Sequence, residues 1–320
     1  MALLEVKDLD VGFDTPEGEV HAVNRLNFSL QAGETLALVG ESGSGKTQTV
    51  MGILGLLAEN GHVGGQALFK GKDLLKMTSS ELNQHRGSEI AMIFQDPMTS
   101  LNPYLRIEKQ MIEVVMHHQG LKKTEARAHA VEILRAVSIP DPERIIRQYP
   151  HEFSGGMRQK VMVAMGLLSE PELLIADEPT AALDVTVQAQ IIHLMSALQK
   201  KSNTAIILIS HDLGIVAGLC DRVLVMYAGE AVECGLVEQI YYDPKHPYTQ
   251  GLLKSVPRLD QAEERDLEAI PGNPPNPLAL PGGCKFRDRC PQAFDACSEK
   301  PPMQVDADRH AFRCFLGTAK

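Results

Sequence analysis

The chain has 320 residues, which predicts a large core domain with an addition rather than one minimal domain. Its formal net charge of -10 argues against a nucleic-acid partner, because general nucleic-acid binders carry a basic face. No apolar run approaches the roughly 18 residues that cross a bilayer, and the first residues carry acids where a signal peptide is basic and then apolar. We therefore expect a cytosolic chain that reaches any membrane through a partner.

The predicted elements begin with a β-hairpin in the first 30 residues, around a Pro-Glu-Gly turn. Short apolar runs then alternate with helical patterns up to about residue 240, which predicts an α/β core with an antiparallel N-terminal subdomain beside a parallel sheet. The predicted strands of the parallel core sheet are residues 35–39, 90–94, 173–176, 204–210 and 222–226.

Two segments depart from this alternation. Between about residues 100 and 160, apolar residues recur three to four positions apart, which predicts a helical insert. Beyond Tyr242, proline and glycine accumulate, and four of the six cysteines lie there. We therefore predict one domain over residues 1–242 and a loop-rich, four-cysteine appendage over residues 243–320.

Residues 40–47, GESGSGKT, follow an apolar strand and open a helix, the context that a phosphate-binding loop requires. Backbone N–H groups in this loop would surround a β-phosphate, Lys46 would reach the β and γ oxygens, and the Thr47 hydroxyl would bind Mg²⁺. A glycine-rich turn without a ligand is the disfavoured alternative. The predicted phosphate-binding residues are Gly40, Ser42, Gly43, Ser44, Gly45, Lys46 and Thr47.

Residues 173–179, LLIADEP, predict an apolar strand that ends in two carboxylates. Metal ligands and bases belong at such a strand end beside a phosphate loop. We expect Asp177 to hold Mg²⁺ through water and Glu178 to polarise the attacking water as the catalytic base. An isolated Asp-Glu pair would more often cap a helix in solvent, but the strand and the phosphate loop favour catalysis.

Two further predicted strands end in polar side chains, namely Gln95 and His211. Ligands collect at the carboxyl edge of a parallel sheet, so we expect both residues to act in catalysis. His211 would contact the γ-phosphate, although a lone histidine is more often a surface or packing residue. The Gln95 amide would bind Mg²⁺ through its oxygen and orient water.

Ser154, Gly155 and Gly156 precede a predicted helix and form a second candidate anion site, because unpaired N–H groups and the helix dipole meet at a helix start. The phosphate loop, Gln95, FSGGM, DEP, LD and His211 together resemble the ATP-binding cassette (ABC) family of transport ATPases over roughly residues 3–240. The resemblance implies that this signature, residues 154–156, clamps the γ-phosphate held by a second cassette in a head-to-tail dimer.

The resemblance also assigns roles to positions that carry little signal alone. It implies that Asp184 lies in the loop between the two nucleotide sites, and that Ala181 stands where relatives often have a small hydroxyl residue. Phe13 matches the aromatic platform for adenine, with a core phenylalanine as the alternative. Hydrolysis of the shared ATP would then open the dimer.

DPMTSLNPY, HPYTQGLL, IPGNPPNP and the cysteine-bearing tail narrow the resemblance to bacterial oligopeptide and dipeptide permease ATP-binding subunits. The implied assembly is a peptide importer with a second, different cassette, two membrane subunits and an external binding protein. This chain would lie peripherally on the cytoplasmic face of the inner membrane, and residues 95–104 would receive short helices of the membrane subunits. The same machinery importing nickel or another small solute is the alternative. A DNA-repair or chromosome ATPase is disfavoured, because the chain lacks a long coiled coil.

Cys284, Cys290, Cys297 and Cys314 are separated by five, six and sixteen residues. Cytosolic thiols stay reduced, and structural zinc usually uses closer cysteine pairs, whereas a four-thiolate iron–sulfur cluster accepts varied spacings. Related permease subunits carry such a cluster in this tail. The resemblance therefore implies a [4Fe-4S] cluster, with zinc or free thiols as alternatives.

Overall fold

The computed structural model describes residues 2–96, 100–180, 183–255 and 269–318. The chain divides into two compact units, which we call the helical unit (residues 31–35 and 77–208) and the β-rich unit (residues 2–30, 36–76 and 209–320). This division differs from the predicted one into residues 1–242 and 243–320, which stays a prediction. Among the described residues, no helix combines the length and apolar character needed to span a bilayer.

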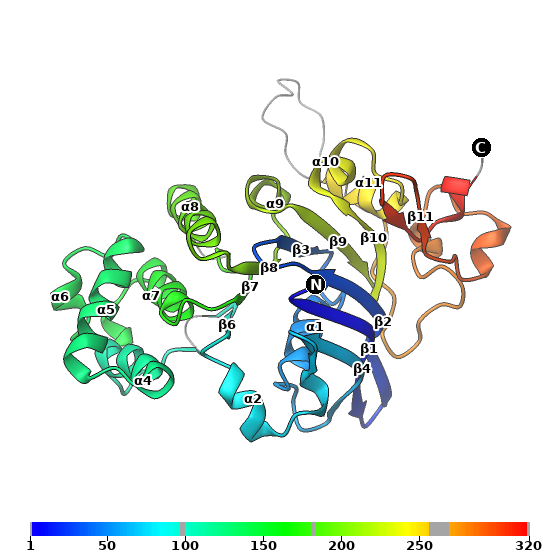
Figure 1. Cartoon of the computed structure of the whole chain (residues 1–320). Helices are drawn as coiled ribbons and strands as arrows, with labels where there is room; N and C mark the ends of the chain where they lie inside the picture. The colour runs from blue at the N-terminus through cyan, green and yellow to red at the C-terminus, as the bar shows by residue number, and fades with distance from the viewer. Residues whose placement is uncertain (1, 97–99, 181–182, 256–268, 319–320) are drawn as a thin grey trace. The chain divides into compact units, whose positions relative to one another are not determined.

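Helices make up most of the helical unit, and those after residue 100 are drawn in green in Figure 1. Two of them, over residues 107–119 and 123–136, bury residues three to four positions apart, such as Ile107, Met111 and Val115, which is the pattern of an amphipathic helix. They lie in the region where the sequence predicts helices. The helices of this unit are α2 (Ser79–His85), α4 (Ile107–Gln119), α5 (Lys123–Ala136), α6 (Pro142–Ile145), α7 (Gly155–Leu167) and α8 (Val185–Ser202).

Three strands of the helical unit lie side by side in the order β6, β7, β8. They are β6 (Ile90–Ile93), β7 (Leu173–Asp177) and β8 (Ala205–Ile209), each within a residue or so of its predicted range. β6 and β7 are parallel, with Ile90 opposite Leu173. All five residues of β7 and of β8 are buried, as expected for strands covered on both faces.

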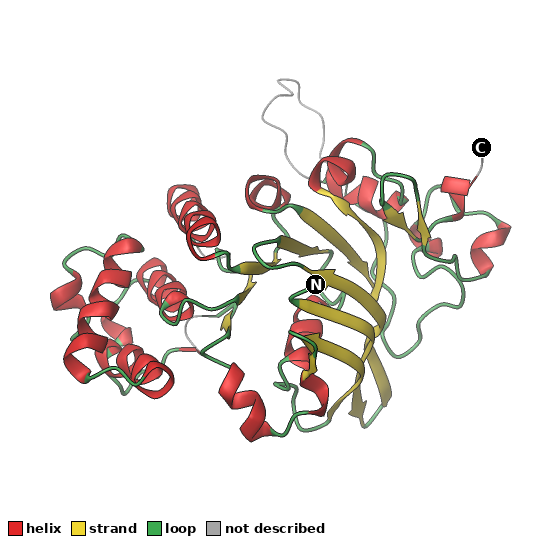
Figure 2. Cartoon of the chain, in the orientation of Figure 1, coloured by secondary structure: helices red, strands yellow, loops and turns green. Residues whose placement is uncertain are grey.

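An antiparallel sheet opens the β-rich unit, in the order β2, β1, β4, β5 (Figure 2). Thr15 pairs with Gly18 across the turn at Pro16 and Glu17, so the predicted hairpin is confirmed. The Thr15 hydroxyl donates to the Gly18 carbonyl at 2.7 Å and closes this turn. The strands are β1 (Leu4–Thr15), β2 (Gly18–Leu30), β4 (Gly61–Phe69) and β5 (Lys72–Asp73).

The other strands of the β-rich unit follow the order β11, β12, β10, β9, β3, and they form a mixed arrangement. β3 and β9 are parallel, as predicted, but β10 runs antiparallel to β9. The reason is the turn between them, where Ala228 and Gly229 have φ of 46° and 80°, the backbone of a tight hairpin. The strands are β3 (Thr35–Val39), β9 (Arg222–Tyr227), β10 (Glu230–Leu236), β11 (Gln304–Val305) and β12 (Ala311–Phe312).

The remaining elements of the β-rich unit are short, and its C-terminal part is rich in loops. The helices are α1 (Lys46–Ile53), α9 (Leu213–Leu219), α10 (Val237–Tyr242) and α11 (Pro247–Lys254). Single 3₁₀ turns in the two units are η1 (Leu74–Lys76), η2 (Pro150–Glu152), η3 (Arg287–Arg289), η4 (Asp295–Ser298) and η5 (Phe315–Thr318).

Candidate functional site

The phosphate loop, residues 40–47, connects β3 to α1 through three glycines with positive φ. A Cβ at Gly40 would lie 2.2 Å from the Met226 carbonyl oxygen, and one at Gly45 would lie 2.3 Å from the Ala22 carbonyl oxygen. These two positions therefore exclude any side chain. Gly43 differs, because its Cβ would meet nothing within 4 Å while its φ of 77° still favours glycine. The backbone of the loop thus turns tightly through left-handed glycines and leaves open space beside Gly43.

Lys46 opens α1, and only 6% of its side chain is exposed. Its Nζ donates to the carbonyl oxygens of Gly40 at 2.7 Å and Glu41 at 2.9 Å, so the loop itself holds the ammonium group. The first turn of α1 contains no acidic residue. A cation and a helix N-terminus therefore coincide at this loop, which favours binding of an anion such as phosphate.

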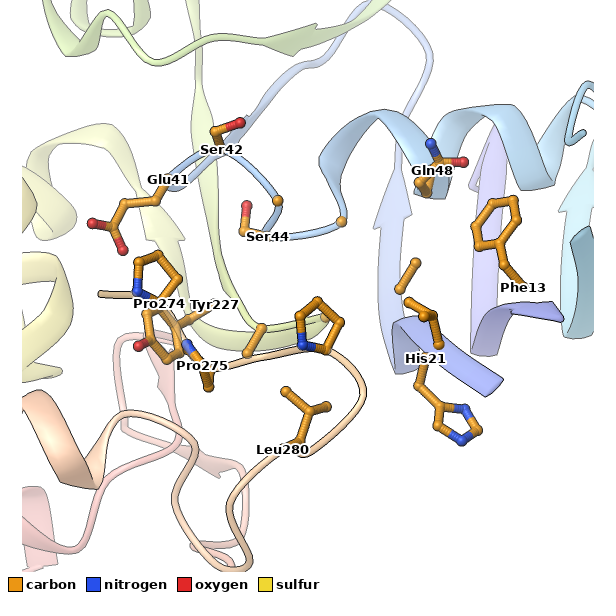
Figure 3. A pocket seen from close by; sticks show the side chains of 17 residues that line it. Phe13, His21, Glu41, Ser42, Ser44, Gln48, Tyr227, Pro274, Pro275 and Leu280 are labelled. Carbon is orange, nitrogen blue, oxygen red and sulfur yellow. The ribbon is translucent and has the colours of Figure 1, made fainter. Parts of the chain in front are cut away.

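A pocket of about 240 Å³ lies beside the phosphate loop within the β-rich unit (Figure 3). Phe13 from β1 lines it, as do Ser42, Gly43, Ser44 and Gly45 of the loop. One pocket is therefore lined both by an aromatic ring and by the phosphate loop, whose N–H groups can bind an anion. Its other lining residues are Val20, His21, Ala22, Glu41, Gln48, Tyr227, Ala228, Gly229, Pro274, Pro275, Pro277 and Leu280.

The C-terminal contribution to this pocket was not predicted from the sequence. Pro274, Pro275, Pro277 and Leu280 line it, although they lie more than two hundred residues beyond the phosphate loop. Proline and glycine enrichment marked this segment only as a loop. A buried Arg289 next to Glu41 was equally unforeseen, since nothing in the local pattern pairs the two.

In the helical unit, the end of β7 carries the predicted carboxylates. Asp177 is the last residue of β7, and 3% of its side chain is exposed. Glu178 follows with a φ of 45°, a left-handed backbone that non-glycine residues rarely adopt outside strained or functional sites. Gln95 Nε2 donates to Glu178 Oε2 at 2.9 Å. The structure therefore brings the predicted base and the predicted water-orienting amide together, although they are 83 residues apart.

The signature lies at the start of α7. Ser154 is the N-cap, and its hydroxyl accepts a hydrogen bond from the Met157 N–H at 3.3 Å. A Cβ at Gly155 would meet nothing within 4 Å, so the backbone there is open to a ligand. Ser154, Gly156 and Asp184 line one groove of about 260 Å³. Two motifs that the family resemblance assigns to the partner interface thus share one surface.

Asp184 is the N-cap of α8 and accepts a hydrogen bond from the Val187 N–H at 2.9 Å. The neighbouring Val185 side chain is 81% exposed, which leaves an apolar group at the surface beside this groove. The position of Ala181 lies outside the described residues. Part of the predicted surface for membrane-subunit helices, residues 97–99 of the segment 95–104, also lies outside them.

His211 is exposed and belongs to the β-rich unit. It follows β8 directly after Ser210, and the next residue, Asp212, caps α9 by accepting hydrogen bonds from the Gly214 and Ile215 N–H groups. The histidine therefore occupies a short turn between a buried strand and a capped helix. Its predicted role at a γ-phosphate stays a prediction.

The prediction of a metal site in the tail is wrong. Among the described residues, no group of three or more His, Cys, Asp or Glu side chains could hold a metal ion, and Cys284, Cys290, Cys297 and Cys314 are free thiols. Burial raises the pKa of Cys314 to about 11 and also raises the pKa of Cys284 and Cys290.

Comparison with protein families gives two matches. Residues 23–181 match the ABC transporter family, and residues 232–297 match the C-terminal region of oligopeptide/dipeptide transporters. The oligopeptide transport ATP-binding protein OppD of Salmonella typhimurium is 56% identical over 98% of this chain and 93% of its own length. The dipeptide transport ATP-binding protein DppD of Lactococcus lactis is 50% identical over 97% of this chain and 89% of its own length.

Solved structures show the same fold. The dimeric ATP-binding cassette MJ0796, bound to ADP and Pi after hydrolysis, has a TM-score of 0.67 at 23% identity, covering 73% of this chain and 98% of that one. The cassette cbiO1 from Clostridium perfringens, part of the cbiONQ ABC transporter complex, has a TM-score of 0.62 at 28% identity, covering 76% of this chain and 91% of that one. The first likeness concerns the fold alone.

Proposed function

From the premise that this chain belongs to the ABC transporter family, we propose that it is the ATP-binding subunit of a bacterial importer of oligopeptides or dipeptides. The observation that carries the proposal is the similarity to peptide transport ATP-binding proteins across nearly the whole chain, the C-terminal region included. The subunit binds and hydrolyses ATP and works with membrane permease subunits. Import of nickel or another solute is not favoured, because these relatives are named for peptides.

The phosphate loop is the proposed ATP site. Its N–H groups surround the phosphates, and the Lys46 ammonium exchanges its loop carbonyl partners for the β and γ oxygens. Support comes from the open space beside Gly43 and from the α1 start. Phe13, across the pocket, is the proposed stacking surface for adenine.

Mg²⁺ prefers hard oxygen ligands, and each residue proposed to bind it carries a side-chain oxygen. The proposed ligands are the Thr47 hydroxyl, the Asp177 carboxylate and the Gln95 amide oxygen. Asp177 is buried at the end of β7, and a buried carboxylate is stable only where positive charge or donors compensate it. When bound, Mg²⁺ neutralises charge that develops on the phosphate oxygens.

For hydrolysis, Glu178 is the proposed base that takes a proton from the attacking water. The Gln95 amide N–H, 2.9 Å from Glu178 Oε2, keeps that carboxylate oriented. His211 is proposed to contact the γ-phosphate. The groove with Ser154, Gly156 and Asp184 is proposed to receive the ATP of a second, different cassette, so that ATP joins two subunits and hydrolysis separates them.

Gentle purification from the native membrane tests this function. We expect the chain to co-purify, on the cytoplasmic face, with a second cassette, two membrane subunits and a binding protein loaded with peptides. Mass spectrometry of the subunits and of ligand released from the binding protein gives the readout. A bound metal chelate instead of peptides, or a preparation without membrane subunits, would contradict the proposal.

A further inference from the structure

Residues 271–280, which we call the proline segment, form one wall of the pocket beside the phosphate loop. Pro274, Pro275, Pro277 and Leu280 line the pocket. In Figure 3, the labelled prolines and Leu280 lie across the open space from Phe13. Proline has no backbone N–H, so three of these four positions cannot donate a main-chain hydrogen bond. The segment therefore offers the pocket an apolar surface.

Arg289 ties the proline segment to the phosphate loop. Its Nη1 and Nη2 donate to the two carboxylate oxygens of Glu41 at 2.6 and 2.9 Å, a bidentate pair. Its Nε donates to the Pro271 carbonyl oxygen at 2.9 Å. Only 8% of Arg289 is exposed, so water hardly weakens these contacts. One guanidinium group thus sets the start of the proline segment against residue 41 of the loop.

An aromatic cluster contacts both Arg289 and Glu41. The rings of Tyr227, Tyr248 and Phe286 lie 4.6 to 5.3 Å apart between centroids. The Tyr227 hydroxyl accepts from Arg289 Nη1 at 3.3 Å, and the Tyr248 hydroxyl accepts from the Glu41 N–H at 2.8 Å. Both the side chain and the backbone of Glu41 are therefore held by the C-terminal part of the chain.

We propose that the proline segment, positioned by Arg289, is the second wall of the nucleotide pocket and packs against the face of the base opposite Phe13. This inference rests on the proposed binding of ATP at the phosphate loop. Since the wall is apolar, it recognises the flat surface of a base without hydrogen-bonding to its edge. It should therefore favour a purine nucleotide over a bare polyphosphate while discriminating little between adenine and guanine.

Binding to the full chain tests the wall. A fluorescent ATP analogue is competed with ATP, GTP and inorganic tripolyphosphate, all with Mg²⁺. We expect Leu280→Ala to weaken ATP and GTP alike by about 5- to 20-fold, from the lost apolar contact, and to leave tripolyphosphate unchanged. Leu278→Ala is the matched control, because Leu278 is in the same segment, 38% exposed, and does not line the pocket.

Arg289 is a positioning residue, and its test uses the same competition. Arg289→Met should weaken ATP by more than about 10-fold, with Arg289→Lys recovering part of the loss, because lysine keeps the charge without the bidentate geometry. Tripolyphosphate should be weakened less than ATP, because Arg289 also pairs with Glu41 of the phosphate loop, whereas a general loss of folding would weaken both equally. Should the Arg289 variants fail to fold, Leu280→Ala and Pro275→Gly test the wall instead. Both substitutions should weaken ATP and GTP and leave tripolyphosphate unchanged.

The outcomes separate this inference from the proposed function. Equal losses for tripolyphosphate and ATP, a loss for ATP but not GTP, or no change in Leu280→Ala would overturn the wall while leaving ATP binding intact. A wild-type chain that binds neither ATP nor tripolyphosphate would instead overturn the proposed nucleotide site itself.

Discussion

Glu178 combines two features expected of a catalytic base, a left-handed backbone and a fixed hydrogen-bond partner. A non-glycine residue in that backbone region costs of order 1–3 kcal/mol, which the surrounding structure must offset. We expect Glu178→Gln to retain ATP binding and to lower steady-state hydrolysis by about 10²- to 10⁴-fold, because an amide cannot accept the proton. Phosphate release and nucleotide binding of the assembled complex measure both quantities.

Glu170 supplies the matched control for that substitution. It is an exposed glutamate of the same unit with a similar backbone, at φ of 50°. Glu170→Gln should therefore leave turnover unchanged. Equal turnover in wild type and Glu178→Gln would refute the role of Glu178 as the base.

His246 predicts a dependence of stability on pH. Burial lowers its pKa to about 4, with Glu233 opposing part of the shift, and only 1% of the side chain is exposed. Between pH 4 and its ordinary value of 6.5, the unfolded chain therefore binds the proton before the folded chain does. The neutral histidine contributes stability that is complete above pH 6.5 and is lost, by roughly 3 kcal/mol, as the pH falls to 4.

Denaturant unfolding at pH 7, 5.5 and 4.5 measures this effect. His246→Asn should show less acid destabilisation than wild type, because asparagine has no group that takes up a proton in this pH range. Its side-chain oxygen can still accept the Tyr248 N–H, which in wild type donates to His246 Nδ1 at 3.1 Å. The exposed His117→Asn should follow the wild-type pH profile. A wild-type profile in His246→Asn would show that His246 does not carry the effect.

At the scale of elements, α7 is tied to the turn that carries Glu178. Gln159 of α7 is 1% exposed, and its Nε2 donates to the Pro179 carbonyl oxygen at 2.6 Å. We expect Gln159→Ala to lower the free energy of unfolding by about 1–3 kcal/mol, since it removes a donor from a buried carbonyl and leaves a cavity. Chemical denaturation measures the loss.

The control for that change is Gln190→Ala on the exposed face of α8, where the side chain accepts from Lys160 at 3.3 Å. Exposed contacts of this kind contribute little, so its stability should stay within about 0.5 kcal/mol of wild type. An equal loss in the free energy of unfolding for the two variants would show that the buried hydrogen bond of Gln159 does not stabilise the fold more than an exposed contact does.

At the scale of the whole molecule, one groove of this chain is proposed to serve a nucleotide bound elsewhere. We expect Ser154→Arg to spare ATP binding by the isolated chain, because Ser154 lines the groove with Gly156 and Asp184 and does not line the pocket beside the phosphate loop. The bulky cation should nevertheless strongly reduce ATP hydrolysis in the complete transporter by blocking the groove for the partner. Nucleotide binding and complex ATPase activity are measured in parallel.

Ser80→Arg is the comparison variant, since Ser80 is exposed at the start of α2 and lines neither of the pockets described above. It should behave like wild type in both assays. Loss of ATP binding by the isolated Ser154→Arg chain would contradict the assignment of the signature to a partner's nucleotide.

Several parts of this protein were determined by short stretches of sequence. The glycines of residues 40–47, the apolar run of β7 and the serine before α7 each specify a local backbone, and the structure has a wound loop, a buried strand and a capped helix there. The Pro-Glu turn likewise specified the first hairpin. Such features depend on backbone sterics and hydrogen bonds within a few residues, so sequence alone predicts them.

Tertiary structure decided the rest, because through-space distance is not encoded in spacing along the chain. The family resemblance and four crowded cysteines predicted a metal cluster, yet among the described residues no group of three or more His, Cys, Asp or Glu side chains could hold a metal ion. Arg289 and Glu41 are 248 residues apart and form a buried pair, which placed the proline segment on the pocket. The Arg289–Glu41 pair forms because the C-terminal loops pack against β9 and α11 through Phe286, Tyr227 and Tyr248. This packing depends on burial and on the shapes of distant side chains, which no local sequence pattern specifies.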